Sequence, residues 1–93
     1  MEFQKSAGRI FALGEDGKVL AEVTFPTVKE GVADIDHTFV DPSLRGQGVA
    51  SKLLRAAAQE IRAQGQKAKP TCSYAVTWFE NHPEEQDLVY KEE

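Results

Sequence analysis

The chain has 93 residues, of which 41% are hydrophobic, and it carries a formal net charge of −4 at pH 7. This length predicts one domain over residues 1–93, and the apolar content is too high for a disordered chain. The acidic balance argues against nucleic acid as a partner. No apolar run approaches the length of a membrane span or a signal peptide, so we expect a cytoplasmic protein without a membrane partner. Cys72 is the only cysteine, which excludes an internal disulfide.

Three strands are expected in the first half of the chain. They cover Arg9–Leu13, residues 19–25 and residues 32–40, and the second of them alternates apolar and polar side chains as a half-buried strand does. Glycine-containing turns at residues 14–17 and 29–31 separate the three. Connections this short favour an antiparallel meander.

The second half alternates helix and strand. Apolar residues at steps of three and four predict a helix over residues 48–64, and Gly65 is a natural stop. Residues 67–72 are expected to form a strand parallel to residues 32–40, because a strand–helix–strand crossover places its two strands parallel.

A second, shorter helix is expected over residues 74–81, with Ser73 as its N-cap. Beyond it, Leu88 and Val89 are expected to dock on the body of the protein. These elements together predict an α/β (α+β) fold with a mixed, mostly antiparallel sheet, one parallel strand pair and two helices.

A glycine-containing loop at residues 45–48 joins the third strand to the first helix. The first amides of a helix have no partner inside the helix, and the helix dipole is positive there, so this arrangement favours an anion. Gly46 and Gly48 carry no Cβ, which lets a phosphate approach the backbone closely. Two common phosphate loops are excluded, because Lys52 has the wrong spacing for a P-loop and Ser51 stands where the dinucleotide fingerprint needs its third glycine.

Residues 45–50 read Arg-x-x-Gly-x-Ala, and Val-Asp-Pro precedes them at residues 40–42. This pattern resembles the acetyl-CoA signature of the GNAT N-acetyltransferase superfamily, Gln/Arg-x-x-Gly-x-Gly/Ala, and an ordinary strand-to-helix turn is the alternative. The segments HTFVDPSLRGQGVASKLL and KPTCSYAVTWFENHPEEQDLV are similar to a very small, single-domain branch of these enzymes. The resemblance implies a minimal GNAT-like fold and transfer of an acetyl group from acetyl-CoA to an amine. It does not imply which amine, because the parts that shape the acceptor site in typical members are nearly absent.

The resemblance also implies a cofactor site. Backbone groups of the third strand would bind the pantetheine arm where the two parallel strands diverge, because unpaired backbone groups need partners. Loop amides, together with one hydroxyl, would hold the pyrophosphate. The residues implied are Phe39, Val40 and Asp41 for the arm, and Arg45, Gly46, Gln47, Gly48, Val49, Ala50 and Ser51 for the pyrophosphate.

Acetyl transfer needs a base for the amine, stabilisation of the developing oxyanion and an acid for the leaving thiolate. Cys72 lies at the implied thioester position, just before a helix start that favours a thiolate; an acetyl-cysteine intermediate and a small buried apolar residue are the two alternatives. A histidine is a common general base because its unperturbed pKa lies near neutrality, so His37 is a candidate. It shares strand parity with Ile35 and Phe39, which favours a histidine in or near the core unless a bulge changes that parity. Tyr74 is the candidate acid, with core packing as the equal alternative.

Other polar and aromatic residues have simpler expected roles. Asp34 and Asp36 are alternative carboxylate bases or solvated side chains, and His82 is expected to cap helix carbonyls. Trp78 and Phe79 are expected to pack, with one of them possible as a wall of the cofactor channel. No pair of His and Cys has metal-ligand spacing, so no metal is expected.

Two alternatives to an enzyme stay open on the sequence alone: a non-catalytic acyl-CoA-binding or sensing module, and a protein-interaction adaptor. A monomer or a weak homodimer is expected. Arg9–Leu13 is the candidate exposed edge strand through which two copies would pair.

Overall fold

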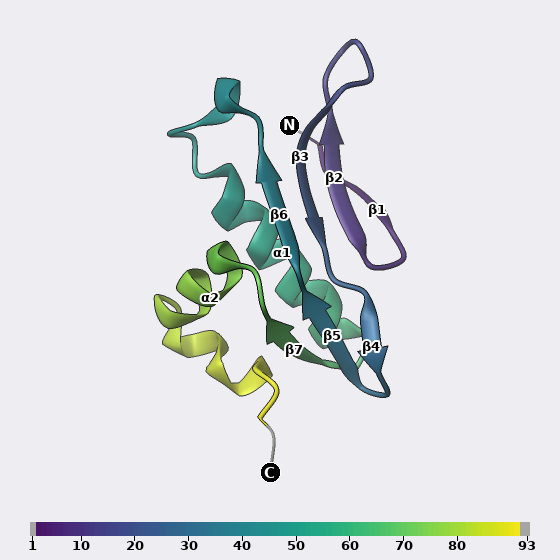
Figure 1. Cartoon of the computed structure of the whole chain (residues 1–93), viewed down its shortest axis with the longest axis vertical. Helices are drawn as coiled ribbons and strands as arrows, with labels where there is room; N and C mark the ends of the chain where they lie inside the picture. Colours follow the sequence, from purple (N-terminus) through teal and green to yellow (C-terminus); the bar gives the residue numbers. More distant parts are fainter. Residues whose placement is uncertain (1, 92–93) are drawn as a thin grey trace.

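The computed structural model describes residues 2–91 and contains two adjoining β-sheets backed by one long helix (Figure 1). A four-stranded sheet has the order β1-β2-β3-β6, and a three-stranded sheet has the order β4-β5-β7. The strands of the four-stranded sheet are β1 (Gln4–Ser6), β2 (Arg9–Leu13), β3 (Val19–Thr24) and β6 (His37–Val40), and those of the three-stranded sheet are β4 (Thr27–Lys29), β5 (Val32–Ile35) and β7 (Lys67–Pro70).

The strand pairing confirms the mixed topology expected from the sequence. β2 pairs with β3 and β3 pairs with β6, both antiparallel, while β5 and β7 are parallel with Val32 opposite Lys67 and Ile35 opposite Pro70. The single long strand predicted over residues 32–40 is wrong. It breaks at Asp36, so that β5 belongs to one sheet and β6 to the other.

Local hydrogen bonds explain the break at Asp36. Its carboxylate accepts from the Thr24 hydroxyl at 2.5 Å, and its amide donates to the Thr24 carbonyl at 3.3 Å. These two bonds hold Asp36 to the end of β3, between β5, which pairs with β4 and β7, and β6. The four residues of β6 then pair with β3, from His37 opposite Thr24 to Val40 opposite Ala21.

The long helix α1 (Val49–Ala63) confirms the predicted helix to within one residue at each end. It contacts β2, β3, β6 and β7, so it covers one face of both sheets (Figure 1). Its buried stripe agrees with the apolar period read from the sequence. The stripe consists of Val49, Leu53, Leu54, Ala57, Ala58 and Ile61.

The short helix α2 (Ser73–Glu80) begins one residue before the predicted start. The prediction that Ser73 caps it is wrong, because Cys72 is the N-cap and its Sγ accepts from the Ala75 amide at 3.4 Å. Trp78 and Phe79 pack in the core as expected. His82 Nδ1 lies 2.6 Å from the Trp78 carbonyl oxygen, which confirms its expected capping position.

β1 was not predicted, and it changes which strand is exposed. Since β2 pairs with β1 on one side and with β3 on the other, the prediction that Arg9–Leu13 is an exposed edge is wrong. The edge of the four-stranded sheet on that side is Gln4–Ser6, a strand of three exposed residues.

The C-terminal segment docks against α1 and β7, as predicted for Leu88 and Val89. Leu88 is buried, Val89 forms a parallel bridge with Ala68, and the Tyr90 amide donates to the Ala68 carbonyl at 2.7 Å. Two short 3₁₀ helices complete the fold, η1 (Pro42–Leu44) before α1 and η2 (Pro83–Leu88) after α2. None of the helices in residues 2–91 is long and apolar enough to span a membrane.

Candidate functional site

The two parallel strands part immediately after Ile35. The carbonyl oxygen of Ile35 accepts from the amides of both Thr71 and Cys72, each at 3.1 Å, and these are the last bonds of the pairing. Beyond this point β6 pairs with β3, whereas the segment that follows β7 turns away into α2. A gap with backbone on both sides therefore opens between β6 and the start of α2.

The backbone of β6 faces this gap at alternate residues. In antiparallel strands, pairs that exchange hydrogen bonds alternate with pairs that do not. The Asp41 amide donates to the Leu20 carbonyl at 2.7 Å, so Phe39, two residues earlier, also faces β3. Thr38 and Val40 lie between them and direct their N–H and C=O groups to the opposite edge of β6, where no strand of residues 2–91 pairs.

The side chains of β6 alternate between the two faces of the sheet. Thr38 is opposite Val23, which belongs to the core cluster formed with α1, so the Thr38 side chain lies on the helix-covered face. His37 points to the other face, which in Figure 1 carries no helix of the described chain. The expectation that His37 shares the core face with Ile35 is wrong, because the break at Asp36 changes the parity, and 53% of the His37 side chain is exposed.

Asp41 fixes the segment that leads into the glycine loop. The Asp41 carboxylate caps η1, accepting from the Ser43 amide at 3.0 Å and from the Ser43 hydroxyl at 2.6 Å. These two hydrogen bonds, helped by Lys18 at 3.7 Å, lower the pKa of Asp41 from its ordinary value. Gly46 and Gly48 both adopt positive φ, +81° and +70°, and space is open where a Cβ would stand at either.

The amide donors of the loop are not all available to a ligand. The Arg45 amide donates to the Pro42 carbonyl at 3.2 Å, and the Asp41 amide is engaged with β3, so both are removed from the expected set of donors. The first bond within α1 runs from the Lys52 amide to the Gly48 carbonyl. The amides of residues 49–51 lie ahead of that bond, at the positive end of the helix dipole.

A pocket of about 450 Å³ occupies this region, and we call it the loop pocket. Of the ten residues predicted to bind the cofactor, seven line it: Phe39, Val40, Arg45, Gly46, Gly48, Val49 and Ala50. Sequence reasoning missed three further lining residues, Thr38, Pro42 and Leu44. Thr38 could not be predicted, because its place at the gap depends on the strand break at Asp36. Pro42 and Leu44 could have been predicted, because the sequence Pro-x-Leu just before the glycine loop is compatible with a short 3₁₀ turn.

Three predicted cofactor residues do not line the loop pocket. Asp41 supports η1, and Gln47 is exposed at the tip of the loop. The Ser51 hydroxyl accepts a hydrogen bond from the indole Nε1 of Trp78 at 3.0 Å and faces a neighbouring cleft between α1 and α2. Its own proton stays available for donation.

Cys72 lies at the mouth of the gap, partly buried. Its Sγ is 3.3 Å from the Thr38 hydroxyl oxygen on β6, in addition to its capping contact with the Ala75 amide. The sulfur thus bridges the two sides of the gap. Its place as the N-cap of α2 is a structural role that the sequence analysis did not anticipate.

The other candidate catalytic residues lie around the gap without clustering on Cys72. His37 Nε2 is 3.6 Å from a Glu22 carboxylate oxygen, and Glu22 also pairs with Arg9. Because His37 and the Thr38–Cys72 contact lie on opposite faces of β6, the histidine is placed to meet a molecule arriving from the open face. Tyr74 is 56% exposed and lines the loop pocket, so packing in the core is wrong for this residue.

The two aspartates of the third predicted strand have local partners. The Asp34 carboxylate accepts from the Thr71 hydroxyl at 2.5 Å, and Asp36 is bound to Thr24 as described above. Within residues 2–91, no three His, Cys, Asp or Glu residues gather as a metal-binding group.

Comparison with known proteins gives this geometry its context. The sequence profile described as GCN5-related N-acetyl-transferase matches residues 10–88. A Staphylococcus aureus protein of known solution structure, provisionally named a GCN5-like N-acetyltransferase, is 32% identical; the match covers 99% of this chain and 90% of that one, with a TM-score of 0.80. No curated protein matches this chain.

Larger proteins share the fold over part of their length. An Agrobacterium tumefaciens protein, provisionally named an acetyltransferase, is 28% identical with a TM-score of 0.67, and the match covers 87% of this chain but 61% of that one. A Mycobacterium tuberculosis protein crystallised with CoA has a TM-score of 0.65 at 19% identity, covering 82% of this chain and 47% of that one. This chain therefore spans about half to three fifths of these two larger relatives.

The fold and the sequence profile together define an acetyltransferase. The profile match covers most of the chain, and the chain belongs to the GCN5-related N-acetyltransferase family.

Proposed function

We propose that this protein transfers an acetyl group from acetyl-CoA to an amine, with the loop pocket as the site of the cofactor. The observation that carries the proposal is the gap beside β6. Thr38 and Val40 present backbone donors and acceptors there without a strand partner, and an extended ligand with amide groups satisfies such an edge as another strand would. The pantetheine arm of CoA has this chemistry.

The pyrophosphate belongs at the other end of the same pocket. Gly46 and Gly48 leave the backbone open to close approach, and the first amides of α1 supply donors where the helix dipole is positive. The Arg45 side chain lines the pocket and adds a positive charge. With the pyrophosphate there and the arm along β6, the acetyl group reaches the region of Cys72 and Thr38.

In the proposed reaction Cys72, as a thiolate, attacks the carbonyl carbon of the acetyl group and forms an acetyl-cysteine. Tyr74 gives a proton to the departing CoA sulfur and recovers one from solvent. The acceptor amine then attacks the carbonyl carbon of the acetyl-cysteine and gives up a proton to solvent, and the cysteine sulfur is released as a thiolate. His37 lies beside Glu22 on the opposite face of β6 from the Cys72 sulfur, so it is not assigned the proton transfer of this step.

The cofactor site is tested by titrating isotope-labelled protein with acetyl-CoA and following backbone amide shifts. We expect shifts centred on residues 46–51, with a second group at Thr38, Val40 and Cys72. Unchanged amide shifts at millimolar acetyl-CoA contradict the proposal and turn the search to protein partners. Binding without turnover across a panel of amines indicates a sensor of acyl-CoA.

A matched pair of glycine variants separates ligand loss from strain. Gly48→Glu places a carboxylate at the pyrophosphate position, and Gly17→Glu introduces the same side chain at φ +82° in the β2–β3 turn, also into open space. Both cost roughly 1–2 kcal/mol of folding free energy, because an L side chain is strained at positive φ. Only Gly48→Glu should lose acetyl-CoA binding; equal affinity in the two variants contradicts the site assignment.

A cytoplasmic location, the amine acceptor and a monomeric or weakly dimeric state remain predictions from the sequence.

A further inference from the structure

The helix-covered face of β6 carries one hydroxyl among apolar side chains. Thr38 lies opposite the buried Val23, and the next pair on the same face is Val40 opposite the buried Ala21. Valine has the β-branched shape of threonine without its hydroxyl and suits a strand equally, so packing alone does not explain a threonine here. In the described part of the chain the Thr38 hydroxyl has a single hydrogen-bond partner, the Cys72 sulfur at 3.3 Å.

We propose that Thr38 is a positioning residue, whose hydroxyl donates a hydrogen bond to the Cys72 sulfur and holds it as a thiolate at the mouth of the gap. This inference rests on the proposed function, in which that thiolate attacks the acetyl group of acetyl-CoA. The thiol proton is lost to solvent, and Thr38 keeps its own proton throughout. The hydroxyl therefore stabilises and orients the anion without taking part in the proton transfer.

The chemistry of the two groups gives the contact its direction. A thiolate has no hydrogen to donate, so the hydroxyl is the donor once Cys72 is ionised. A neutral thiol sulfur is a weak acceptor, whereas a hydrogen bond to an ionised partner is roughly twice as strong as a neutral one. The partly buried hydroxyl is thus better satisfied by the thiolate than by the thiol, and the contact favours the anion.

A second donor reaches the same sulfur from the other side of the gap. The Ala75 amide donates to Cys72 Sγ at 3.4 Å in the first turn of α2, where the helix dipole also favours a negative charge. The sulfur is therefore fixed by one donor from β6 and one from α2. Thr38 also lines the loop pocket, so this contact borders the cavity in which the proposed cofactor arm ends.

Thiol reactivity tests the contact in the absence of cofactor. Iodoacetamide reacts with the thiolate, so its rate of reaction with Cys72 at pH 7 reports the anion. Thr38→Val and Thr38→Ala lack the donor and should each slow this reaction about tenfold, the size expected when one charge-assisted contact is lost. Thr38→Ser keeps the hydroxyl and should react as wild type does. Since Thr38→Ala also opens space beside the sulfur, a change of access alone would speed the reaction.

Thr27→Val is the matched control. It exchanges the same two side chains at an exposed position of β4, where the lost hydroxyl contacts only Gln66, and it should react as wild type does. Thermal unfolding of each variant, measured alongside, separates lost thiol chemistry from lost structure. A merely structural tie between β6 and α2 would lower the unfolding temperature of Thr38→Val and leave its alkylation rate unchanged.

The acetyl step is tested with the same variants. Mass spectrometry of the Cys72 peptide at successive times after mixing with saturating acetyl-CoA gives the rate at which acetyl-cysteine forms. The proposed arm binds the backbone of β6, so Thr38→Val should lower this rate about tenfold with little change in the dissociation constant of acetyl-CoA. Thr38→Ser should restore the rate. Weaker binding at an unchanged saturated rate contradicts the positioning role.

Failure of this inference is distinguishable from failure of the proposed function. If Thr38→Val and Thr38→Ala are alkylated at the wild-type rate or faster, the positioning role is wrong and the proposed function stands. If alkylation depends on Thr38 as expected but wild-type Cys72 forms no acetyl-cysteine, the covalent route of the proposed function is wrong, and the role of Thr38 in acetyl transfer falls with it.

Discussion

At the scale of single residues, the sulfur of Cys72 makes two contacts that stabilise the folded structure. It caps α2 through the Ala75 amide, and it contacts the Thr38 hydroxyl across the gap. A cysteine in such a position is explained by packing and capping alone, so its proposed nucleophilic role needs a substitution that keeps the cap and removes the chemistry.

Cys72→Ser is that substitution, because serine caps helices well and can still contact Thr38. Cys72→Ala removes the cap as well and should lower the free energy of unfolding by about 0.5–2 kcal/mol, whereas Cys72→Ser should be near neutral. If Cys72 carries the acetyl group, both variants lose at least about 100-fold in acetyl transfer. Mass spectrometry of the Cys72 peptide after incubation with acetyl-CoA shows the intermediate directly. A serine variant with wild-type turnover excludes covalent catalysis and leaves Cys72 as a cap.

Asp41 is a second residue whose observed role differs from the predicted one: it was expected to bind the cofactor, and its carboxylate instead caps η1. Its pKa is lowered because Ser43 donates two hydrogen bonds to the carboxylate. A carboxyl group with a lowered pKa in the folded state stabilises the fold above its unfolded value of 3.8, and this stabilisation is lost as the pH falls through the lowered value. The stabilisation that the Asp41 carboxylate gives to η1 should therefore be constant between pH 5 and 8.

Asp41→Asn should accordingly weaken acetyl-CoA binding and lower the unfolding temperature by the same amounts at pH 8 and at pH 5. The difference in unfolding temperature from wild type should shrink only in strong acid, where the wild-type carboxylate is itself protonated. Thermal denaturation across this pH range measures it. A difference that disappears between pH 8 and pH 5 would contradict the assignment to this carboxylate.

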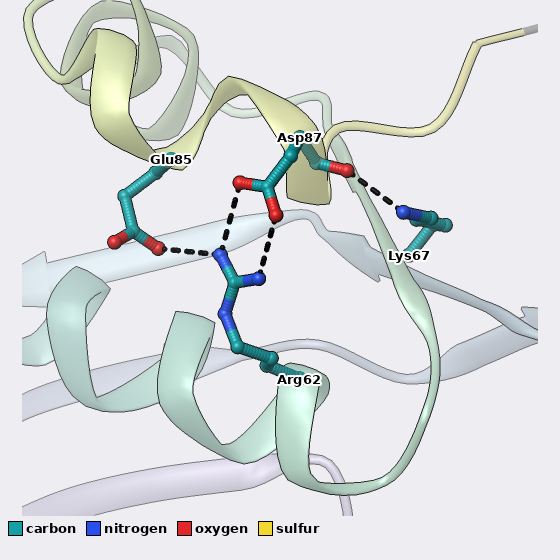
Figure 2. Close-up of polar contacts among 4 residues, drawn as sticks. All are labelled: Arg62, Lys67, Glu85 and Asp87. Carbon is teal, nitrogen blue, oxygen red and sulfur yellow. Dashed lines mark hydrogen bonds and ion pairs between the residues drawn. The ribbon is translucent and has the colours of Figure 1, made fainter.

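At the scale of elements, the C-terminal segment is fixed by a charged cluster that joins it to α1 and β7 (Figure 2). The Arg62 guanidinium contacts both carboxylate oxygens of Asp87, at 2.8 and 3.2 Å, and one oxygen of Glu85 at 3.1 Å. Lys67 Nζ donates to the Asp87 carbonyl at 2.7 Å. Two-point contact between a guanidinium and a carboxylate has more directional specificity than an ordinary surface ion pair.

Arg62→Met keeps most of the aliphatic stem and removes the charge, so it should loosen η2 and speed amide exchange at Val89 and Tyr90. Hydrogen bonds from Arg62 lower the pKa of Asp87 from its ordinary value of 3.8, so the effect should be full above about pH 5 and fade as the pH falls through the lowered value. It should also weaken in 1 M salt, which screens exposed charges. Lys5→Met, which breaks the single ion pair of the exposed Lys5 with Glu60, is the control and should change little.

The elements that the sequence predicts best are those whose signal is local. The period of α1 and the glycine that ends it are properties of a short window, and the parallel crossover follows from the order strand, helix, strand. The break at Asp36 is not local, because it depends on hydrogen bonds with Thr24 on another strand. That break determines on which face of the sheet the side chains of His37 and Thr38 lie. The glycine loop of the site could therefore be predicted from the sequence, whereas the face of His37 and the position of Thr38 at the gap could not.

At the scale of the whole molecule, one core supports both sheets and the site. The core cluster includes Val23 of the four-stranded sheet, Ile35 of the three-stranded sheet and Leu53 of α1, so neither sheet has a core of its own. A domain of this size has a free energy of unfolding of about 5–10 kcal/mol. The gap lies where the sheets separate, bounded by β6 on one side and by the start of α2 on the other. A ligand that bridges this gap adds contacts between two parts of the molecule that otherwise meet through the core and at the single contact of Thr38 with Cys72.

Saturating acetyl-CoA should therefore stabilise the whole domain. At a free concentration 100 times the dissociation constant, the gain is about 2.7 kcal/mol by mass action. Since 1 kcal/mol shifts the unfolding temperature of a domain of this size by roughly 4–8 °C, the shift should be on the order of 10–20 °C. Gly17→Glu should show the full shift from its own lower starting point and Gly48→Glu should show none, as measured by differential scanning calorimetry. Hydrogen exchange adds the spatial test: protection should rise at β6 and at the start of α2 together, because the ligand ties the two sides of the gap. Protection confined to the glycine loop would mean that the pyrophosphate binds while the pantetheine arm stays outside the gap, and the proposed path to Cys72 would then be wrong.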